Sequence, residues 1–334
     1  MTTSHPGAAE RGGSLARRSV TSFEVGAQSV ANVAPSAVIA FAPAAMAASA
    51  GNGAWLSFAI GLLGVLAIAY CICVFARRRA GATSLYAFSR LSLGPSGAFV
   101  TGWALLIGSV AIAAGSLAGA GFYLSRVLDS VGITAFDGVL GQVFLDALLA
   151  VVAAWVTIVG VRIAARVSSA LEVLSILLIV VVLIAVFFKI GHLFDLAQIT
   201  LKGASPDGVV FAVVLAVLGF VGFEAAASLG AEASDPFKAI PRAITGSAVL
   251  AGLLYIFATY TQVAGFGGPE ALAKSADPME DLAAASGMSF LAPFLDIGFT
   301  ASFIAVVMAY LENLFYPDVL EKLGGRLAAE NYHV

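Results

Sequence analysis

Two short segments place helix-breaking residues inside long apolar runs. The first is residues 32–37, Asn-Val-Ala-Pro-Ser-Ala, and the second is residues 219–224, Gly-Phe-Val-Gly-Phe-Glu. Proline has no amide hydrogen and interrupts a helix, and each glycine costs a helix about 1 kcal/mol. A break of this kind leaves backbone amides and carbonyls without helical partners, and such groups can bind a charged ligand.

The two breaks predict complementary chemistry. Pro35 suits the first turn of a helix, so the amides of Ser36, Ala37 and Val38 would face a carboxylate. The free carbonyls around residues 219–221 would suit an ammonium group. Together they describe a site for a zwitterion such as an amino acid. The candidate substrate-binding residues are Ala34, Pro35, Ser36, Ala37, Gly219, Phe220 and Gly222.

Acidic and hydroxyl side chains inside apolar runs are candidates for ion or proton coupling. These are Glu224, Glu172, Thr300 and Ser302. A charge at the centre of a membrane helix costs roughly 2.5–3.5 kcal/mol on insertion scales, so each acid is a functional hypothesis. The alternatives are a structural carboxylate for Glu224, an interfacial position for Glu172, and hydroxyls bonded within their own helix. Asp146 and Asp296 are expected in a vestibule or at an interface.

The elements that must position these residues are membrane-spanning helices. The chain is 60% hydrophobic and 11% charged, with a mean hydropathy of +0.98, which excludes a soluble globular enzyme. About 20 apolar residues span a bilayer as a helix. The sequence predicts an all-α integral membrane protein with spans at residues 25–49, 54–76, 97–125, 139–161, 168–190, 208–230, 244–266 and 289–311.

The distribution of basic residues predicts the orientation. With the N-terminus inside, 13 of the 17 lysines and arginines fall in inside segments. The positive-inside rule therefore favours a multi-pass protein of the cell (inner) membrane with both termini cytoplasmic. The polar tails would be residues 1–24 and 312–334.

Other functional classes find no support in the sequence. The three histidines lie outside the spans or at their ends, and no His-Glu-x-x-His motif or channel filter repeat is present. We expect no catalytic residues, no metal site, no cofactor and, with a net charge of −3, no nucleic-acid partner. Cys71 and Cys73 are expected to be free thiols.

Three segments resemble the amino acid–polyamine–organocation permeases. Residues 211–244 are similar to that family's span-6 signature, through Gly222-Phe223-Glu224, Glu232, Pro236, Lys238 and Ile240-Pro241-Arg242. The connection from Arg77 to Trp103 is similar through Gly81, Tyr86-Ala87-Phe88, Arg90, Gly94, Gly97 and Gly102-Trp103. Ala34-Pro35 resembles a variant of the span-1 break. The resemblance covers about residues 24–311.

The resemblance implies a five-plus-five inverted-repeat fold. It also implies transport of amino acids or related amines, either by exchange or coupled to protons or sodium ions. The first repeat would be residues 25–190 and a partial second repeat residues 191–311. Family members usually have about twelve spans, whereas spans 9 and 10 are missing after the eighth. The alternative is a non-transporting membrane fragment, or one part of a split transporter whose partner supplies those spans.

Overall fold

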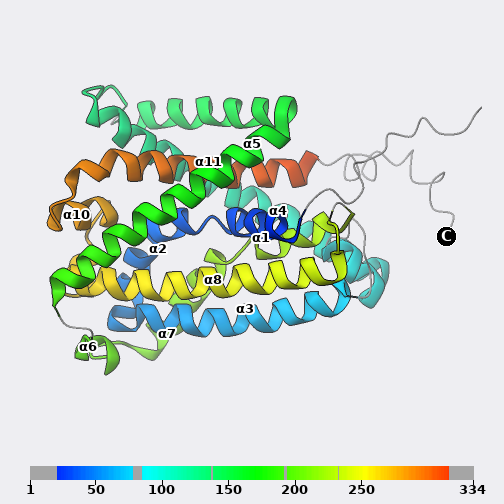
Figure 1. The fold of residues 1–334 in the computed structure, drawn as a ribbon, viewed down its shortest axis with the longest axis horizontal. Coiled ribbons are helices and arrows are strands. Elements are labelled where there is room, and N and C mark those ends of the chain that lie inside the picture. The colour runs from blue at the N-terminus through cyan, green and yellow to red at the C-terminus, as the bar shows by residue number, and fades with distance from the viewer. Residues whose placement is uncertain (1–20, 78–84, 137, 192–193, 232, 316–334) are drawn as a thin grey trace, which may run out of the picture.

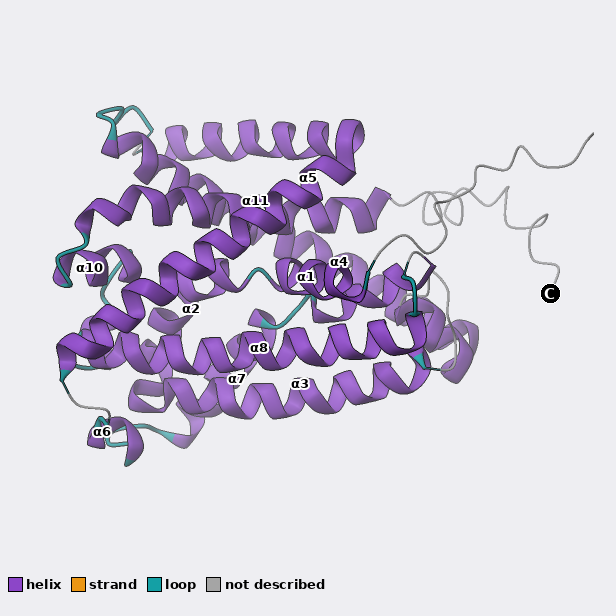
Figure 2. Cartoon of the chain, viewed as in Figure 1, coloured by secondary structure: helices purple, strands orange, loops and turns teal. Residues whose placement is uncertain are grey.

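The computed structural model describes residues 21–77, 85–136, 138–191, 194–231 and 233–315. Throughout these ranges the regular elements are helical, apart from an isolated bridge residue, and they are joined by short loops (Figure 2). Residues 1–20 and 316–334 of the predicted tails lie outside the described residues, as do two residues of the family signatures, Gly81 and Glu232. The all-helical architecture agrees with the fold class that the apolar runs predict.

The helices run mainly along the long axis of the molecule (Figure 1). In chain order they are α1 (Ser22–Val33), α2 (Pro35–Ala50), η1 (Gly51–Gly53), α3 (Ala54–Ala76), α4 (Leu85–Ser130), α5 (Val139–Ile190), α6 (Leu196–Ile199), α7 (Pro206–Gly219), η2 (Phe223–Ala231), α8 (Pro236–Gly265), α9 (Pro269–Leu272), α10 (Pro278–Ala285), η3 (Ser289–Leu291) and α11 (Ala292–Phe315).

Seven of the described segments are long and apolar enough to cross a membrane, whereas the sequence predicts eight. The difference lies in the first segment, Ser22–Ala76, which is 55 residues long. The chain turns back within it at η1, where Gly51 has a φ of 56°, and α3 runs in the opposite direction to α2 (Figure 1). This one described segment therefore contains both predicted runs.

Two other helices also extend beyond the predicted spans. α4 begins at Leu85 and contains a non-helical residue, Gly94, with a φ of 76°. α5 continues through residues 162–167, although the sequence predicts a connection there, and Figure 1 shows that it bends sharply between its two apolar halves. The candidate membrane segments within α5 are Val139–Ile158 and Ser169–Ile190.

The outer surface of the bundle is apolar, as contact with lipid requires. Large side chains on α4 and α5 are mostly exposed, including Phe99 (65%), Trp155 (63%) and Ile158 (81%). The buried core lies along α2, α3, α8 and α11 and includes Phe58, Tyr255 and Phe299. A soluble protein would not expose such a surface, so its extent supports a membrane location.

Small residues allow the helices beside the first break to approach closely. α3 packs against α7 and α8. A Cβ added at Gly61 would lie 3.0 Å from the Ala216 side chain, and one at Gly252 would lie 2.7 Å from Leu62. Membrane helices use small residues in this way because close packing replaces the hydrophobic effect as the source of association.

Gly222 brings the two predicted breaks together. Its φ of 108° lies in a region that only glycine adopts without strain. A Cβ at this position would lie 2.3 Å from the carbonyl oxygen of Asn32, at the end of α1. The backbone after α7 therefore lies directly against the backbone before Pro35.

Gly222→Ala tests this contact. We expect a loss of stability of at least about 1–3 kcal/mol from backbone strain alone, with a further cost from the clash with Asn32. The matched control is Gly246→Ala in α8, where a Cβ has open space and alanine should stabilise the helix by about 0.5–1 kcal/mol. Unfolding of the purified protein by sodium dodecyl sulfate measures both changes. Equal stability of the two variants would contradict the contact.

Candidate functional site

The first break is confirmed and is one residue long. α1 ends at Val33, Ala34 adopts a left-handed conformation (φ 48°, ψ 61°), and Pro35 opens α2. The amide of Ala34 donates hydrogen bonds to the carbonyls of Val30 and Ala31, at 3.2 and 3.1 Å. A left-handed alanine costs of order 1–3 kcal/mol, so the surrounding structure must hold this conformation in place.

A carboxylate from α5 occupies the first turn of α2. The backbone amide of Ser36 donates to Glu172 Oε1 at 2.9 Å, and the Ser36 hydroxyl donates to Oε2 at 2.8 Å. Both residues are buried, with 0% of Ser36 and 2% of Glu172 exposed. The sequence assigns the Ser36 amide to the carboxylate of a ligand. In the structure this amide instead binds a carboxylate of the protein, that of Glu172.

The two hydroxyl candidates on α11 differ in their contacts. The Ser302 hydroxyl faces the carboxylate of Glu172, but it has no hydrogen bond of normal geometry to any described residue. Thr300 donates to the carbonyl of Asp296 at 2.8 Å, one turn earlier in its own helix. Ser302 therefore belongs to the Glu172 site, whereas Thr300 makes the intrahelical bond that the alternative interpretation expects.

The second break begins where α7 ends at Gly219. The Gly219 carbonyl accepts a hydrogen bond from the Tyr255 hydroxyl of α8 at 2.9 Å. Phe220 is fully buried, with its ring centroid 6.5 Å from Phe58 and 5.3 Å from Tyr255. The Gly219 carbonyl is therefore satisfied by Tyr255, which the sequence analysis missed. Its only sequence signal is a hydroxyl-bearing ring in the middle of the predicted span 244–266.

Glu224 satisfies an amide of its own turn. Its Oε2 accepts from the Gly222 amide at 3.0 Å, and the side chain is half-buried. The segment that it begins, η2, is a 3-10 helix rather than the α-helix expected for a second half-helix. This contact matches the structural interpretation of Glu224, in which the carboxylate binds an amide freed by the break.

Further side-chain bonds join the two breaks to α8. The Ser29 hydroxyl of α1 lies 2.9 Å from that of Ser247 and 3.4 Å from the Phe223 carbonyl. Of the predicted substrate residues, Ser36 binds the Glu172 carboxylate, and Gly222 lies against the end of α1. No described side chain bridges Ser36 directly to Phe220.

A third interruption, which the sequence analysis did not identify as a site, lies within α2. Pro43 has no amide hydrogen, so the Ile39 carbonyl one turn earlier loses its helical donor. The side-chain amide of Gln262, fully buried in α8, donates to that carbonyl at 3.1 Å. Gln262 thus compensates for the proline, and α8 holds both halves of the first span.

The remaining acids lie away from the breaks. Asp146 accepts from Gln142 of its own helix at 3.1 Å. Asp296 is 3% exposed and lies near Asp277 and Glu280. Burial, together with the negative charge of Glu280, raises the pKa of Asp277 to about 6, although the Glu280 backbone amide opposes the shift.

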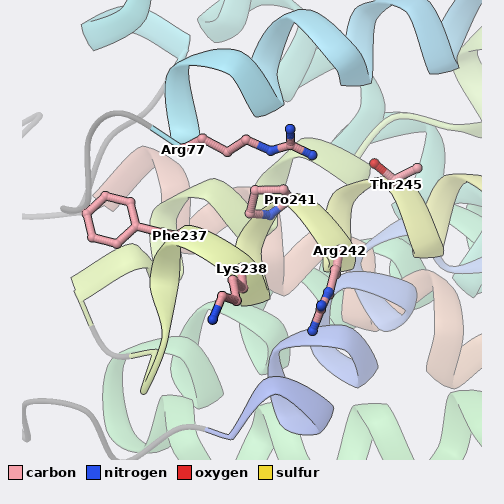
Figure 3. Close-up of a pocket in the computed structure, with 6 residues that line it drawn as sticks. All are labelled: Arg77, Phe237, Lys238, Pro241, Arg242 and Thr245. Atoms are coloured by element: carbon pink, nitrogen blue, oxygen red, sulfur yellow. The ribbon is translucent and has the colours of Figure 1, made fainter.

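A groove of about 560 Å³ lies at the end of α3 and the start of α8. Figure 3 shows Arg77 lying over Pro241, whereas Lys238 and Arg242 point to the other side of that proline. The groove contains none of the predicted site residues. It holds basic residues that the positive-inside rule assigns to the cytoplasmic face.

The comparisons with known proteins concern most of the chain. A family model described as amino acid permease matches residues 24–312. The branched-chain amino acid permease BcaP of Bacillus subtilis is 26% identical over 286 residues, which cover 79% of this chain and 58% of BcaP. The low-affinity putrescine importer PlaP of Escherichia coli K12 is 25% identical over 222 residues, 61% of this chain and 44% of PlaP. An uncharacterized transporter of Mycobacterium tuberculosis is 25% identical over 277 residues, 81% of this chain and 58% of its own length. The chain thus spans about half the length of these relatives.

Ser36→Ala tests the contact with Glu172. It removes the hydroxyl donor and keeps the amide, so we expect a loss of about 1.5–3 kcal/mol, the range for hydrogen bonds to charged groups. The control is Ser49→Ala, whose hydroxyl bonds the Met46 carbonyl of the same helix and whose loss should change stability by less than about 1 kcal/mol. Sodium dodecyl sulfate unfolding measures both. A Ser36→Ala variant as stable as the control would show that the bond contributes nothing.

Proposed function

Because the chain belongs to the amino acid permease family, whose members are transporters and not enzymes, we propose that it carries amino acids or related amines across the cell membrane as a secondary transporter. The observation that carries the mechanism is the contact of Glu172 with Ser36. In this proposal the helical segments form the five-plus-five inverted-repeat arrangement of the family, with the substrate between the breaks in spans 1 and 6.

Ser36 is the point at which the substrate carboxylate competes with the Glu172 carboxylate. Its amide and hydroxyl form the pair of donors at the start of α2, where the helix dipole favours a negative group. A substrate carboxylate can bind them only after Glu172 withdraws. Withdrawal of an ionised side chain would leave a buried charge without its partners, which is strongly unfavourable.

Protonation removes this obstacle. A proton bound to the Glu172 carboxylate neutralises it and weakens its two bonds to Ser36. The Ser36 amide and hydroxyl are then free for the substrate's carboxylate, and the proton stays on Glu172. One proton therefore enters the site with each amino acid, which is the stoichiometry of a proton-coupled carrier.

The substrate's ammonium group would bind at the second break. The Gly219 carbonyl has a second lone pair beside the bond from Tyr255, and it can accept from both groups. Phe220 would cover the site as a packed aromatic wall. Glu224 accepts from the Gly222 amide and is the second candidate for proton coupling.

A second candidate follows from the same contact. If the substrate is an amine without a carboxylate, Glu172 is its counter-ion, and Ser36 orients that carboxylate. The relative PlaP is described as a putrescine importer, whereas BcaP is described as a branched-chain amino acid permease. In the first candidate a negatively charged substrate carboxylate replaces Glu172 at Ser36. In the second, a positively charged amine binds Glu172 directly.

Glu172→Gln separates the candidates. For an amino acid substrate, we expect binding of a branched-chain amino acid to persist and to lose its dependence on pH, because glutamine cannot take up a proton. For an amine substrate, we expect putrescine binding to fall by about tenfold or more, the loss of a charge-assisted bond. Radioligand binding to the purified chain measures both across a pH series.

The control is Glu224→Gln, which removes another acid of the site and leaves Ser36 and Glu172 in contact. Parent-like pH dependence in Glu172→Gln and its loss in Glu224→Gln would transfer the coupling role to Glu224.

Uptake is measured for the chain alone and for a version extended by the C-terminal region of BcaP. Uptake by the extended version alone would support the alternative of a partial or split transporter.

The proposed topology has eight crossings, with the turn at η1 separating the first two, and both termini in the cytoplasm. The basic residues around the groove of Figure 3 support this orientation. A cysteine introduced at Arg78, with Cys71 and Cys73 replaced by alanine, should be labelled by a membrane-impermeant maleimide only after the cells are opened. A cysteine at Lys202 should react in intact cells. The reverse pattern would contradict the orientation.

A further inference from the structure

Four charged side chains meet at the start of α10. They are Arg126 of α4, Asp277 and Glu280 at the start of α10, and Asp296 of α11. Figure 1 shows α10 at the same end of the bundle as α6, away from the break between α1 and α2. One oxygen from each of the three carboxylates lies within 4.8 Å of the others. Asp277 and Asp296 are each only 3% exposed.

Arg126 balances part of this charge. Its Nη2 donates to Glu280 Oε2, and its Nε lies 4.0 Å from Asp277 Oδ2, beyond hydrogen-bond distance. If all three carboxylates are ionised, one guanidinium leaves two negative charges uncompensated. No further basic group forms an ion pair with these acids among the described residues.

Two buried oxygens in the cluster lack a partner. Asp277 Oδ2 and Asp296 Oδ1 have no hydrogen bond to any residue that the structure describes. A buried carboxylate oxygen without a donor or cation is strongly unfavourable. Either a bound cation or a proton shared between Asp277 and Asp296 would supply the partner that these oxygens lack, and calcium binding distinguishes the two.

We propose that Asp277, Glu280 and Asp296 bind a divalent cation of the calcium class. The donors are all carboxylate oxygens, which hard cations prefer. Calcium binds oxygen at about 2.3–2.6 Å, so oxygens up to roughly 5 Å apart can share one ion. A double positive charge matches the two uncompensated negative charges, whereas one ammonium group would leave one of them.

The positions of the three acids show how an ion could reach the site and which helices it would connect. Glu280 has a side chain that is 34% exposed, so an ion can enter from water beside it. The bound ion would tie α10 to α11 at one end of the bundle. Arg126 would compete with the ion, because its guanidinium already takes one oxygen of Glu280.

Calcium binding to the full chain, purified in detergent, tests the site. We expect one calcium ion per chain by equilibrium dialysis with radioactive calcium. Glu280→Gln and Asp296→Asn should each weaken binding by about tenfold or more, since affinity follows the charge of the ligands. The matched control is Glu270→Gln, an exposed acid of α9 at the same end, which should bind like the parent.

Arg126→Gln gives the sharpest result, because the two interpretations of the cluster predict opposite signs. If the acids bind a cation, removal of the competing guanidinium tightens calcium binding. If the acids only hold Arg126, the variant loses thermal stability and gains no affinity, which would overturn the proposal.

Two other results would overturn it as well: parent-like calcium affinity in Glu280→Gln, or no calcium binding by the parent chain. Glu280→Gln decides the matter even if the buried Asp296→Asn variant fails to fold, because Glu280 is partly exposed. The site and the proposed transport fail separately, since calcium binding is measured without substrate.

Discussion

Every backbone group that leaves a helix within the apolar bundle must find another partner. Lipid offers no hydrogen bonds, so irregular backbone persists in a membrane only where protein covers it or where it lines a cavity. In this chain the required partners are specific side chains. Tyr255 bonds the Gly219 carbonyl, Gln262 bonds the Ile39 carbonyl, and Glu224 bonds the Gly222 amide. The packing of α8 against the first span follows from this requirement, because two of these three side chains belong to α8.

The Ser36 amide differs from the others because its partner carries a charge. Glu172 accepts from this amide through Oε1 and from the Ser36 hydroxyl through Oε2, and it thereby connects α2 to α5, with Ser302 of α11 beside it. A neutral partner such as Gln262 has one state, whereas a carboxylate has two that differ in charge and in the strength of its bonds. The same constraint that stabilises the break can therefore make it respond to protons.

The helix breaks could be predicted from the sequence, whereas the side chains that bond the freed backbone groups could not. Pro35 predicts the first break because proline acts through its own ring, and Gly222 predicts the second because no other residue adopts a φ of 108° without strain. The partners Tyr255, Gln262 and Glu172 lie far away in sequence, and only the folded packing brings them to the freed groups. For the same reason the sequence assigned the Ser36 amide to a ligand. The predicted boundary between residues 49 and 54 agrees with the turn at η1. The helix ends within α5 were missed because helical backbone continues through a segment whose composition suggests a connection.

The central claim is that Glu172 takes up a proton when a substrate carboxylate replaces it at Ser36. Calorimetric titration of the purified chain with a branched-chain amino acid, in buffers of different ionisation enthalpy, measures this proton directly. We predict an uptake of about one proton per substrate bound, consistent with a single coupled carboxylate, and none in Glu172→Gln. Substrate binding by the parent without proton uptake, or an unchanged uptake in Glu172→Gln, would contradict the account.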